Sequence, residues 1–312
     1  MALHNQTLVT EFILQGFSET PQVQILLFIS LLFLYLIALT GNILIVMAIG
    51  LNSGLHTPMY FFLANLAILD IGCTCTVLPK LLENLYVEKK SISYEGCMTQ
   101  VFFLTFFLDI ELLLFTAMAY DRYVAICHPL RYRTMMSRMV CMLLVSSVWA
   151  TGVFSSLINT GLMVRLTFCG PNEIQHFLCE IPSLLVLSCS STYLNNIMVV
   201  IADVYFGVIN FVLTMVSYGF IISNILKIRT TEGKKKAFST CSSHLMVVSM
   251  YYTTIIYAYI FPGSDSSVDN SKVVTLLYTA VDPALNPFIY TLRNKDFKTA
   301  LKNCFQSLNN YK

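Results

Sequence analysis

An acidic and a basic side chain stand side by side where a long apolar stretch of the sequence ends. Residues 101–119 are almost wholly apolar, and Asp121 and Arg122 follow after Tyr120. A charge at a membrane boundary is costly to bury unless it is paired or reaches water. Two interpretations follow from these residues: the pair anchors a helix end by extending toward water, or it acts as a latch between helices.

Further polar groups lie inside apolar stretches, where an ionised side chain costs roughly 3 kcal/mol unless it has a partner. Asp70 and Glu111 fall in the middle of two such stretches. They are either two separately satisfied acids or a facing pair that shares a cation or a proton. His244 is the only histidine inside the apolar stretches, and such a histidine is more often structural than functional.

The composition indicates which elements must hold these groups. Of the 312 residues, 56% are hydrophobic and 12% are charged, about half the charged share of a soluble domain. Residues 25–49 lack the regularly spaced polar positions that a helix of a soluble protein presents to water. The apolar stretches that reach the roughly 20 residues needed to cross a bilayer lie near 25–50, 58–82, 98–126, 139–163, 196–226, 237–261 and 272–292.

These stretches predict an all-α fold, a seven-transmembrane helix bundle that occupies residues 25–292. An arm at 1–24 precedes the bundle, and a tail at 293–312 follows it. We expect a short amphipathic helix in this tail, directly after the seventh span.

Charge distribution predicts the orientation of the bundle. Most Lys and Arg residues fall on the side that carries residues 122–138, residues 227–236 and the tail. Basic residues favour the cytoplasmic side, so the N-terminus is predicted to be extracellular. Asn5 begins the sequon Asn5-Gln6-Thr7 on that side, and we expect it to be glycosylated.

The cysteines, like the charges, are distributed unevenly between the two predicted sides of the membrane. Four of them fall on the predicted oxidising side, where they can form two disulfides in any of three pairings: Cys97, Cys169, Cys179 and Cys189. A zinc site is the competing interpretation. His176 is the only histidine in this connection and the spacing does not suit a tight cluster, so we expect no metal there.

Five stretches, in this order, resemble the olfactory (odorant) receptors, a branch of the rhodopsin-like G-protein-coupled receptors. They are LHTPMYFFLANLAILD at 55–70, MAYDRYVAICHPLRY at 118–132, SY at 217–218, KAFSTCSSH at 236–244 and PALNPFIYTLRNKD at 283–296. The resemblance extends from about residue 41 to 298. Tyr252, which lacks a following proline, is also typical of this branch.

The resemblance implies roles for particular residues. It implies disulfides between Cys97 and Cys179 and between Cys169 and Cys189. It also implies a sodium- or proton-linked pair at Asp70 and Glu111. The implied activation switch comprises Asp121, Arg122, Tyr123, Tyr218, His244, Asn286, Pro287 and Tyr290.

The same resemblance implies a function. The chain is expected to be an odorant receptor of the plasma membrane, not an enzyme, that binds a small, largely apolar, volatile molecule in the outer half of the bundle. The expected partner is a stimulatory G protein that raises cyclic AMP. We expect no cofactor beyond a bound sodium ion, and no nucleic-acid partner.

Helical spacing from Cys97 and the other anchors predicts the residues that line the ligand pocket. Most of them are apolar or aromatic, and a few polar groups among them can orient a small guest. The predicted lining residues are Leu104, Thr105, Leu108, Asp109, Glu180, Asp203, Phe206, Gly207, Tyr252, Ile255, Ile256, Tyr259, Leu276 and Thr279.

Two acids depart from the usual pattern of the family. Asp109 stands where a small residue such as glycine is common, and an acid there favours a ligand with a hydrogen-bond donor or a positive charge. We therefore expect tolerance for amines or hydroxylated odorants. Asp282 stands where threonine is common, one turn before Asn286, and it is expected to enlarge the acidic sodium site.

Two other classes of protein were weighed against the receptor. A transporter predicts internal repeats with broken helices in both halves, but the sequence shows no such two-fold pattern. An intramembrane enzyme needs a nucleophile beside a base, and Ser242, Ser243 and His244, as neighbours in a helix, point in different directions. Neither class accounts for Asp121 and Arg122.

Overall fold

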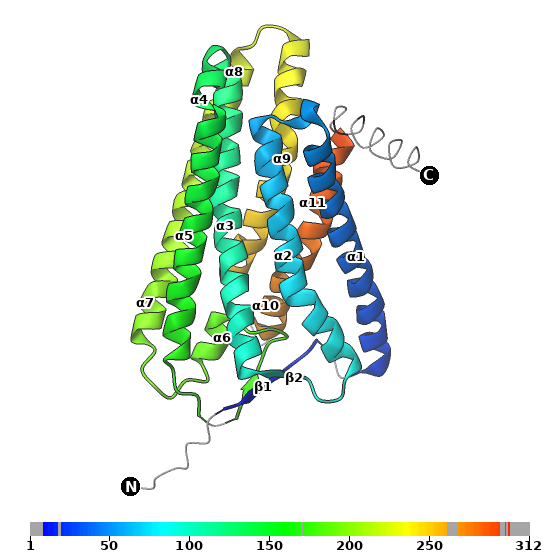
Figure 1. Cartoon of the computed structure of the whole chain (residues 1–312), viewed down its shortest axis with the longest axis vertical. Helices are drawn as coiled ribbons and strands as arrows, with labels where there is room; N and C mark the ends of the chain where they lie inside the picture. Colours follow the sequence, from blue (N-terminus) through cyan, green and yellow to red (C-terminus); the bar gives the residue numbers. More distant parts are fainter. Residues whose placement is uncertain are drawn as a thin grey trace.

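The structure is a computed structural model in which long helices run side by side as one bundle (Figure 1). It describes residues 9–17, 20–169, 171–260 and 267–293, together with 297 and 299, without the side chains of 258–260, 267–270 and 291–293. Asn5 and the expected amphipathic helix of the tail therefore lie outside the described residues.

Five helices among the described residues are long and apolar enough to cross a membrane. The first four are α1 (Pro21–Leu51), α2 (Pro58–Tyr86), α3 (Tyr94–Cys127) and α5 (Arg138–Val164). The fifth extends over Tyr193–Lys227 and consists of α7 (Tyr193–Ala202), a π-helical segment (Asp203–Ile209) and α8 (Asn210–Lys227).

Two further helical stretches complete the bundle and overlap the apolar stretches near 237–261 and 272–292. They are α9 (Thr231–Ile260) and a broken helix that consists of α10 (Ser267–Leu276), a π-helical segment (Leu277–Val281) and α11 (Asp282–Arg293). The shorter helical pieces are Ser53–Leu55, Pro129–Arg131, α4 (Tyr132–Met135) and α6 (Ile181–Leu185).

Local sequence explains where several helices begin. Proline occupies the first position of α1 and α2, where its missing N–H is not needed. The hydroxyl of Ser93 accepts a hydrogen bond from the Gly96 N–H at 3.1 Å and caps α3. Ser137 caps α5 in the same way through the Val140 N–H.

A small sheet closes one end of the bundle, which we call the sheet end. It has the strand order β2-β1-β3 and consists of β1 (Glu11–Leu14), β2 (Ser91–Ser93) and β3 (Glu173–Ile174). The sequence analysis predicted only helices, and it missed this sheet because each strand is very short and the strands come from distant parts of the chain. The alternating burial of β1 places Phe12 and Leu14 in an apolar cluster beneath the sheet.

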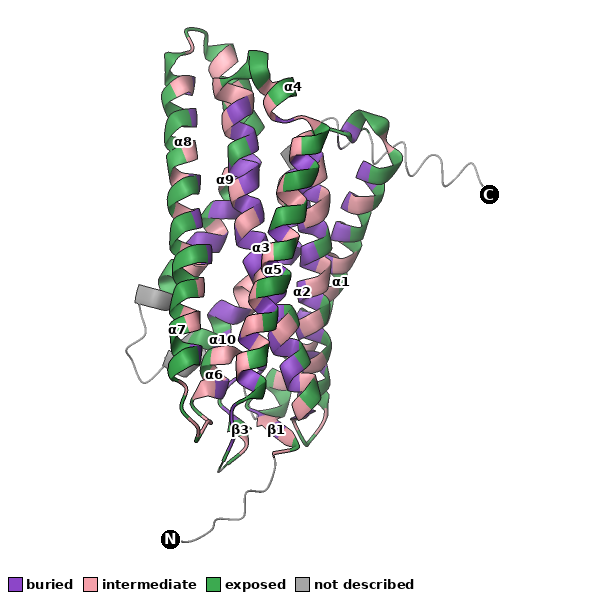
Figure 2. Cartoon of the chain, turned by 60° about the vertical axis from the view of Figure 1, so that its left-hand side comes forward, coloured by how far each residue is buried: buried purple, intermediate pink, exposed green. Residues whose placement is uncertain are grey.

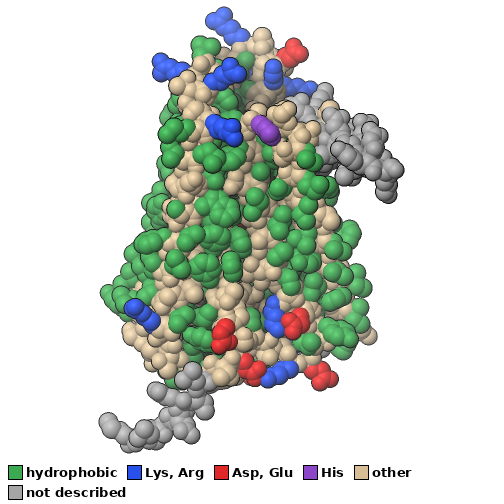
Figure 3. Space-filling view, in the orientation of Figure 1, with side chains coloured by type: hydrophobic (Ala, Val, Ile, Leu, Met, Phe, Trp, Pro, Cys, Tyr) green, Lys and Arg blue, Asp and Glu red, His purple; other side chains and the backbone are tan. Residues whose placement is uncertain are grey.

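Helix α3 lies at the centre of the bundle and contacts α2, α5, α8 and α9. Buried residues lie mostly on the parts of the helices that face the interior of the bundle, and exposed residues lie on the outer parts (Figure 2). Apolar side chains cover the middle of the molecule, and charged side chains gather near its two ends (Figure 3). This distribution suits a bundle whose outer surface contacts lipid, and the chain is a helical membrane protein.

Helices α1 and α11 approach closely at Gly41. A Cβ atom at this position would lie 2.7 Å from Cγ of Pro287, whose ring cannot rotate away. By contrast, a Cβ at Gly50, in the same helix, would meet no atom within 4 Å.

Replacement of Gly41 by alanine is therefore expected to lower the free energy of unfolding by about 1–3 kcal/mol, because α1 and α11 must move apart. Gly50→Ala is the matched control, and it should leave stability unchanged or raise it by up to about 1 kcal/mol through helix propensity. Unfolding of the two purified variants in detergent measures the difference. Equal stability of the two variants would contradict the close contact.

Candidate binding cavity and polar networks

A cavity of about 720 Å³ lies between α3, the helix containing α7 and α8, α9 and α10, with α6 beside it. Its size falls within the range of small-molecule sites. Most residues of the predicted pocket line this cavity. They are Leu104, Thr105, Leu108, Asp109, Glu180, Asp203, Gly207, Tyr252, Ile255 and Ile256.

The remaining predicted pocket residues are placed elsewhere. Phe206 is buried in the main apolar core, Leu276 packs against a cluster formed largely by α1 and α2, and Thr279 is fully buried. Phe206 and Thr279 lie within the two π-helical segments, where the wider turn points side chains away from their α-helical positions. The side chain of Tyr259 lies outside the described residues.

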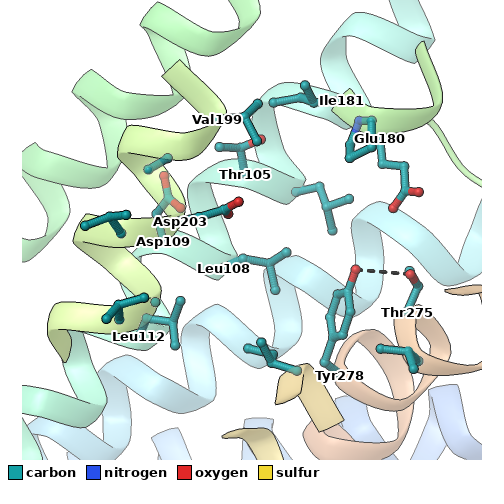
Figure 4. Close-up of a pocket in the computed structure, with 18 of the residues that line it drawn as sticks. Thr105, Leu108, Asp109, Leu112, Glu180, Ile181, Val199, Asp203, Thr275 and Tyr278 are labelled. Carbon is teal, nitrogen blue, oxygen red and sulfur yellow. Dashed lines mark hydrogen bonds between the residues drawn. The ribbon is translucent and has the colours of Figure 1, made fainter. Parts of the chain in front are cut away.

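Several residues that line the cavity were missed. Tyr278 enters through the second π-helical segment, and its hydroxyl donates a hydrogen bond to Thr275 Oγ1 at 3.2 Å (Figure 4). The other missed residues are Leu112, Asn159, Ile181, Pro182, Val199, Val200, Ala202, Val204, Val208, Phe211, Tyr251, Ser271, Val274 and Thr275. Spacing along straight helices gives no signal for residues such as those of α6, because the chain path decides their position.

Asp109 is held against α5. Its Oδ2 accepts a hydrogen bond from the Ser155 hydroxyl at 2.6 Å, and the Ser155 carbonyl in turn accepts one from the Asn159 amide at 3.1 Å. The Asp109 side chain is nevertheless part of the cavity wall, where Asp203 lies close enough for the two charges to interact. Two carboxylates therefore face one part of a mostly apolar cavity.

A disulfide and an amide fix the mouth of the cavity at the sheet end. Cys97 of α3 is bonded to Cys179, with the Cα atoms 5.4 Å apart, and a second disulfide joins Cys169 to Cys189. These are the pairs that the family resemblance implies. Gln100 Oε1 accepts a hydrogen bond from the Cys179 N–H at 2.8 Å. The adjacent Glu180 is thereby positioned at the cavity wall.

Burial changes the acid–base properties of the mouth. Desolvation, together with the positive charge of Lys272, lowers the pKa of His176 from 6.5 to about 4. Desolvation raises the pKa of Glu180, and a hydrogen bond from the Ser183 hydroxyl partly opposes this shift. His176 Nε2 lies 3.8 Å from Glu180 Oε1, and it has no hydrogen-bond partner among the described residues.

A second polar group lies deep in the bundle, between α2, α3 and α11. The Asn286 amide donates a hydrogen bond to Asp70 Oδ2 at 3.0 Å. Glu111 Oε1 and Asp282 Oδ2 are buried and have no hydrogen-bond partner in the described part of the chain. Their charges nevertheless interact with that of Asp70. The Asn42 amide of α1 donates a hydrogen bond to the Pro283 carbonyl at 2.9 Å, which connects α1 to this region.

A third polar network occupies the end of the bundle that carries α4, which we call the far end. The Arg122 guanidinium pairs with Asp121, whose other carboxylate oxygen accepts a hydrogen bond from the Tyr132 hydroxyl at 2.7 Å. Arg122 also donates to the Thr240 carbonyl of α9 at 3.4 Å. Both side chains of the pair are buried, so this is an internal contact between α3 and α9 and not a solvated helix end.

The other predicted switch residues of this region make separate contacts. Tyr218 of α8 and Nδ1 of His244 of α9 are joined by a hydrogen bond of 2.7 Å, and Tyr290 is buried with no partner for its hydroxyl among the described residues. Tyr123 is directed elsewhere, since its hydroxyl lies 3.1 Å from Nε2 of His128. Pro287, also a predicted switch residue, contacts α1 at Gly41.

The serines beside His244 do not form a catalytic pair with it. The Ser242 hydroxyl donates to the Ser239 carbonyl at 3.4 Å, and the Ser243 hydroxyl donates to the Ile289 carbonyl at 3.1 Å. His244 instead bonds to Tyr218. Each serine hydroxyl is thus engaged with the backbone, as is common for serine within helices.

The bundle holds a mostly apolar cavity near the sheet end and an ionic network at the far end. Comparison with known proteins gives the family, since a family model described as olfactory receptor matches residues 31–307. Human olfactory receptor 13A1 is 59% identical over 308 residues, which is 99% of this chain and 94% of the relative. Human olfactory receptor 13G1 is 50% identical, with coverage of 97% and 99%.

Similarity extends to another species, since the olfactory receptor-like protein OLF4 of Canis lupus familiaris is 46% identical over 98% of this chain and 99% of its own length. The chain belongs to the olfactory receptor family, whose members are receptors and not enzymes. It is accordingly an odorant-sensing, G-protein-coupled membrane receptor.

Acid is expected to lower the stability of the folded protein through His176, which lies at the mouth of the cavity. Its pKa in the folded state, about 4, lies below the ordinary 6.5, so the unfolded chain binds a proton first as the pH falls. The stability that neutral His176 contributes is complete above about pH 6.5 and is lost as the pH falls toward 4. Between pH 7 and pH 5, wild type should lose about 2 kcal/mol more stability than His176→Gln.

Unfolding of the purified proteins in detergent at pH 7 and pH 5 measures this difference. The matched control is His56→Gln, which replaces an exposed histidine and should follow the wild-type pH dependence. Glu180 titrates in the opposite direction but remains in both variants. Parallel pH profiles of wild type and His176→Gln would exclude a buried, neutral His176.

Proposed function

We propose that this receptor crosses the plasma membrane seven times, with its N-terminus outside, and binds a small odorant in the 720 Å³ cavity. The bound odorant activates a stimulatory G protein, which raises cyclic AMP. Five helices have the length and composition of membrane spans. We assign the sixth span to α9 and the seventh to the broken helix from α10 to α11, both of which pack in the same bundle.

One observation carries the proposal: α3 borders the cavity and also holds the ionic network of the far end. Leu104, Leu108 and Asp109 line the cavity, and Asp121 and Arg122 follow along the same helix. A ligand that shifts α3 against its neighbours therefore acts on the contact between Arg122 and Thr240 of α9.

Release of the contact between Arg122 and Thr240 is the step that would couple ligand binding to the far end. Arg122 is 6% exposed and Asp121 is 1% exposed, so the resting arrangement excludes water from the pair. Movement of α9 away from α3 would free the guanidinium and expose it at the far end. The basic residues around 227–236, which directly precede and begin α9, would then face the same opening and the G protein.

The proposal is tested in cells that express the receptor with a stimulatory G protein and a cyclic-AMP reporter. An epitope placed before Met1 and detected on intact cells checks both surface expression and orientation. A panel of volatile alcohols, aldehydes, esters, acids and amines is expected to contain compounds that raise cyclic AMP. A panel without any active compound, despite surface expression, would count against the stimulatory coupling.

Arg122→Ala is expected to reduce the ligand-dependent rise at least tenfold, because the group that the switch uncovers is absent. Arg165→Ala, which replaces an exposed arginine at the sheet end, is the matched control and should respond as wild type. Ligand-dependent thermal stabilisation of the purified variants separates loss of coupling from loss of folding. A normal response of Arg122→Ala would refute the assigned switch.

We further propose that Asp70 and Glu111 share a sodium ion or a proton in the resting state, with Asp282 nearby. The orphaned, buried carboxylate oxygens of Glu111 and Asp282 fit a cation that supplies their missing partner. No three His, Cys, Asp or Glu side chains cluster closely enough to hold a metal ion within the described part of the chain. Neutral oxygens, such as those of Asn286, would therefore have to complete the coordination of sodium.

Sodium is expected to stabilise wild type relative to choline at equal ionic strength, by about 1.4 kcal/mol at a concentration tenfold above Kd. The effect should be absent in Asp70→Asn and retained in Glu83→Gln, which replaces an acid at the surface. Thermal unfolding in the two salts is the measurement. Equal unfolding temperatures of wild type in both salts would leave the proton as the shared cation.

A further inference from the structure

The first π-helical segment, Asp203–Ile209, forms one wall of the cavity. Gly207 and Val208 line the cavity, whereas Phe206 is buried in the main apolar core. Each residue turns a helix by about 100°, so one residue more or less in this turn changes which side chains face the cavity. The backbone conformation of the segment therefore decides the shape of the wall.

Asn210, the first residue of α8, stabilises the irregular backbone of this segment. Its side-chain amide donates a hydrogen bond to the Tyr205 carbonyl, five residues earlier, at 2.8 Å. Its backbone N–H donates to the Gly207 carbonyl, whereas a regular α-helix would offer the Phe206 carbonyl. Because π-helical turns are rare within helices, we attribute the persistence of this one to these two donors.

The other end of the same amide is bonded to α3. Asn210 Oδ1 accepts a hydrogen bond from the Thr116 hydroxyl at 2.7 Å, and the Thr214 hydroxyl lies 3.4 Å from that of Thr116. Only the NH2 group can donate to the Tyr205 carbonyl, so this bond fixes the amide orientation and directs its oxygen to Thr116. Asn210 is 3% exposed, so water does not replace a bond that is lost.

This contact lies between the cavity and the far end of the bundle. Leu112, one turn before Thr116 on α3, lines the cavity (Figure 4). Tyr218, about two turns after Asn210 on α8, is hydrogen-bonded to His244. A change in the π-helical segment would therefore alter both the cavity wall and the contact of α8 with α3.

We propose that Asn210 is a positioning residue of the odorant site, which holds the π-helical wall of the cavity and joins this wall to α3 through Thr116. The proposal rests on the proposed function, because it concerns the same cavity. Without the Asn210 amide, the Tyr205 carbonyl loses its side-chain donor and the turn relaxes toward an α-helix. The relaxed segment carries position 207 away from the cavity.

The position of the wall is measured without a ligand. A Cβ atom at Gly207 would meet no atom within 4 Å, so a cysteine fits there and lines the cavity. Purified Gly207→Cys receptor in detergent is treated with a small, water-soluble methanethiosulfonate. Peptide mass spectrometry gives the labelling rate at position 207 and distinguishes it from labelling of the other free cysteines.

Two variants are then added to the Gly207→Cys receptor. Asn210→Leu keeps a branched side chain but removes the donor and the acceptor, and it should slow labelling at least roughly tenfold, because a buried hydrogen bond no longer favours the π-helical conformation. Thr116→Val keeps the shape of the side chain and removes only the hydroxyl that orients the amide. It should slow labelling in the same direction, by roughly threefold.

Asn224→Leu is the matched control, because it makes the same change on the same helix. The Asn224 amide donates to the Phe220 carbonyl, four residues earlier, at 2.9 Å. This variant should label at the rate of the Gly207→Cys parent. The unfolding temperature shows whether each variant is folded, and Thr116→Val decides the test if Asn210→Leu does not fold.

Each outcome bears on the positioning role alone. Slower labelling in Asn210→Leu and Thr116→Val, with the control at the parent rate, supports it. Unchanged labelling in either variant, when folded, overturns it, and so does an equal slowing in Asn224→Leu. Absence of labelling in the Gly207→Cys parent also overturns it, because the π-helical conformation presents this position to the cavity. No outcome depends on an odorant or a G protein, so the proposed function stands or fails separately.

Discussion

The structure depends on a single constraint, which is that a helix in an apolar bundle must provide partners for its buried charges. Helix α3 carries most of them, and each is directed to a different neighbour. Asp109 bonds to α5 through Ser155, Glu111 faces the acids of α2 and α11, and Arg122 reaches the backbone of α9. The hydrogen bonds of Asp109 and Arg122 hold the rotation and depth of α3, because a small displacement would leave a buried polar group without its partner.

The two π-helical segments are the points at which the bundle departs from regular helices. One places Asp203 at the cavity, and the other presents Tyr278 to the cavity and leads into Asp282 at the deep polar group. A π-helical turn is less favourable than an α-helical turn and is found most often at functional sites. Both segments here lie beside the candidate sites, so the local irregularity shapes the cavity and links it to the polar interior.

Much of this architecture could be predicted from residue type and spacing. The apolar stretches overlap the long helices, and Asp121 and Arg122 stand out by their place after residues 101–119, although the sequence left open whether the pair reaches water or joins two helices. Leu104, Thr105 and Leu108, which helical spacing predicts for the pocket, lie in the cavity wall, and α3 is regular there. Phe206, predicted by the same spacing, lies in a π-helical segment and is buried in the main apolar core.

The sequence by itself determined that the chain is a helical membrane protein of this receptor family, because hydrophobicity over some twenty residues and the order of short motifs are local properties. The tertiary structure decided what no local pattern contains. It brought β1 between β2 and β3, set Glu180 at the cavity beside the disulfide of Cys179, and directed Asp203 toward Asp109. These arrangements join residues far apart in the chain, and their energies arise only when the helices pack.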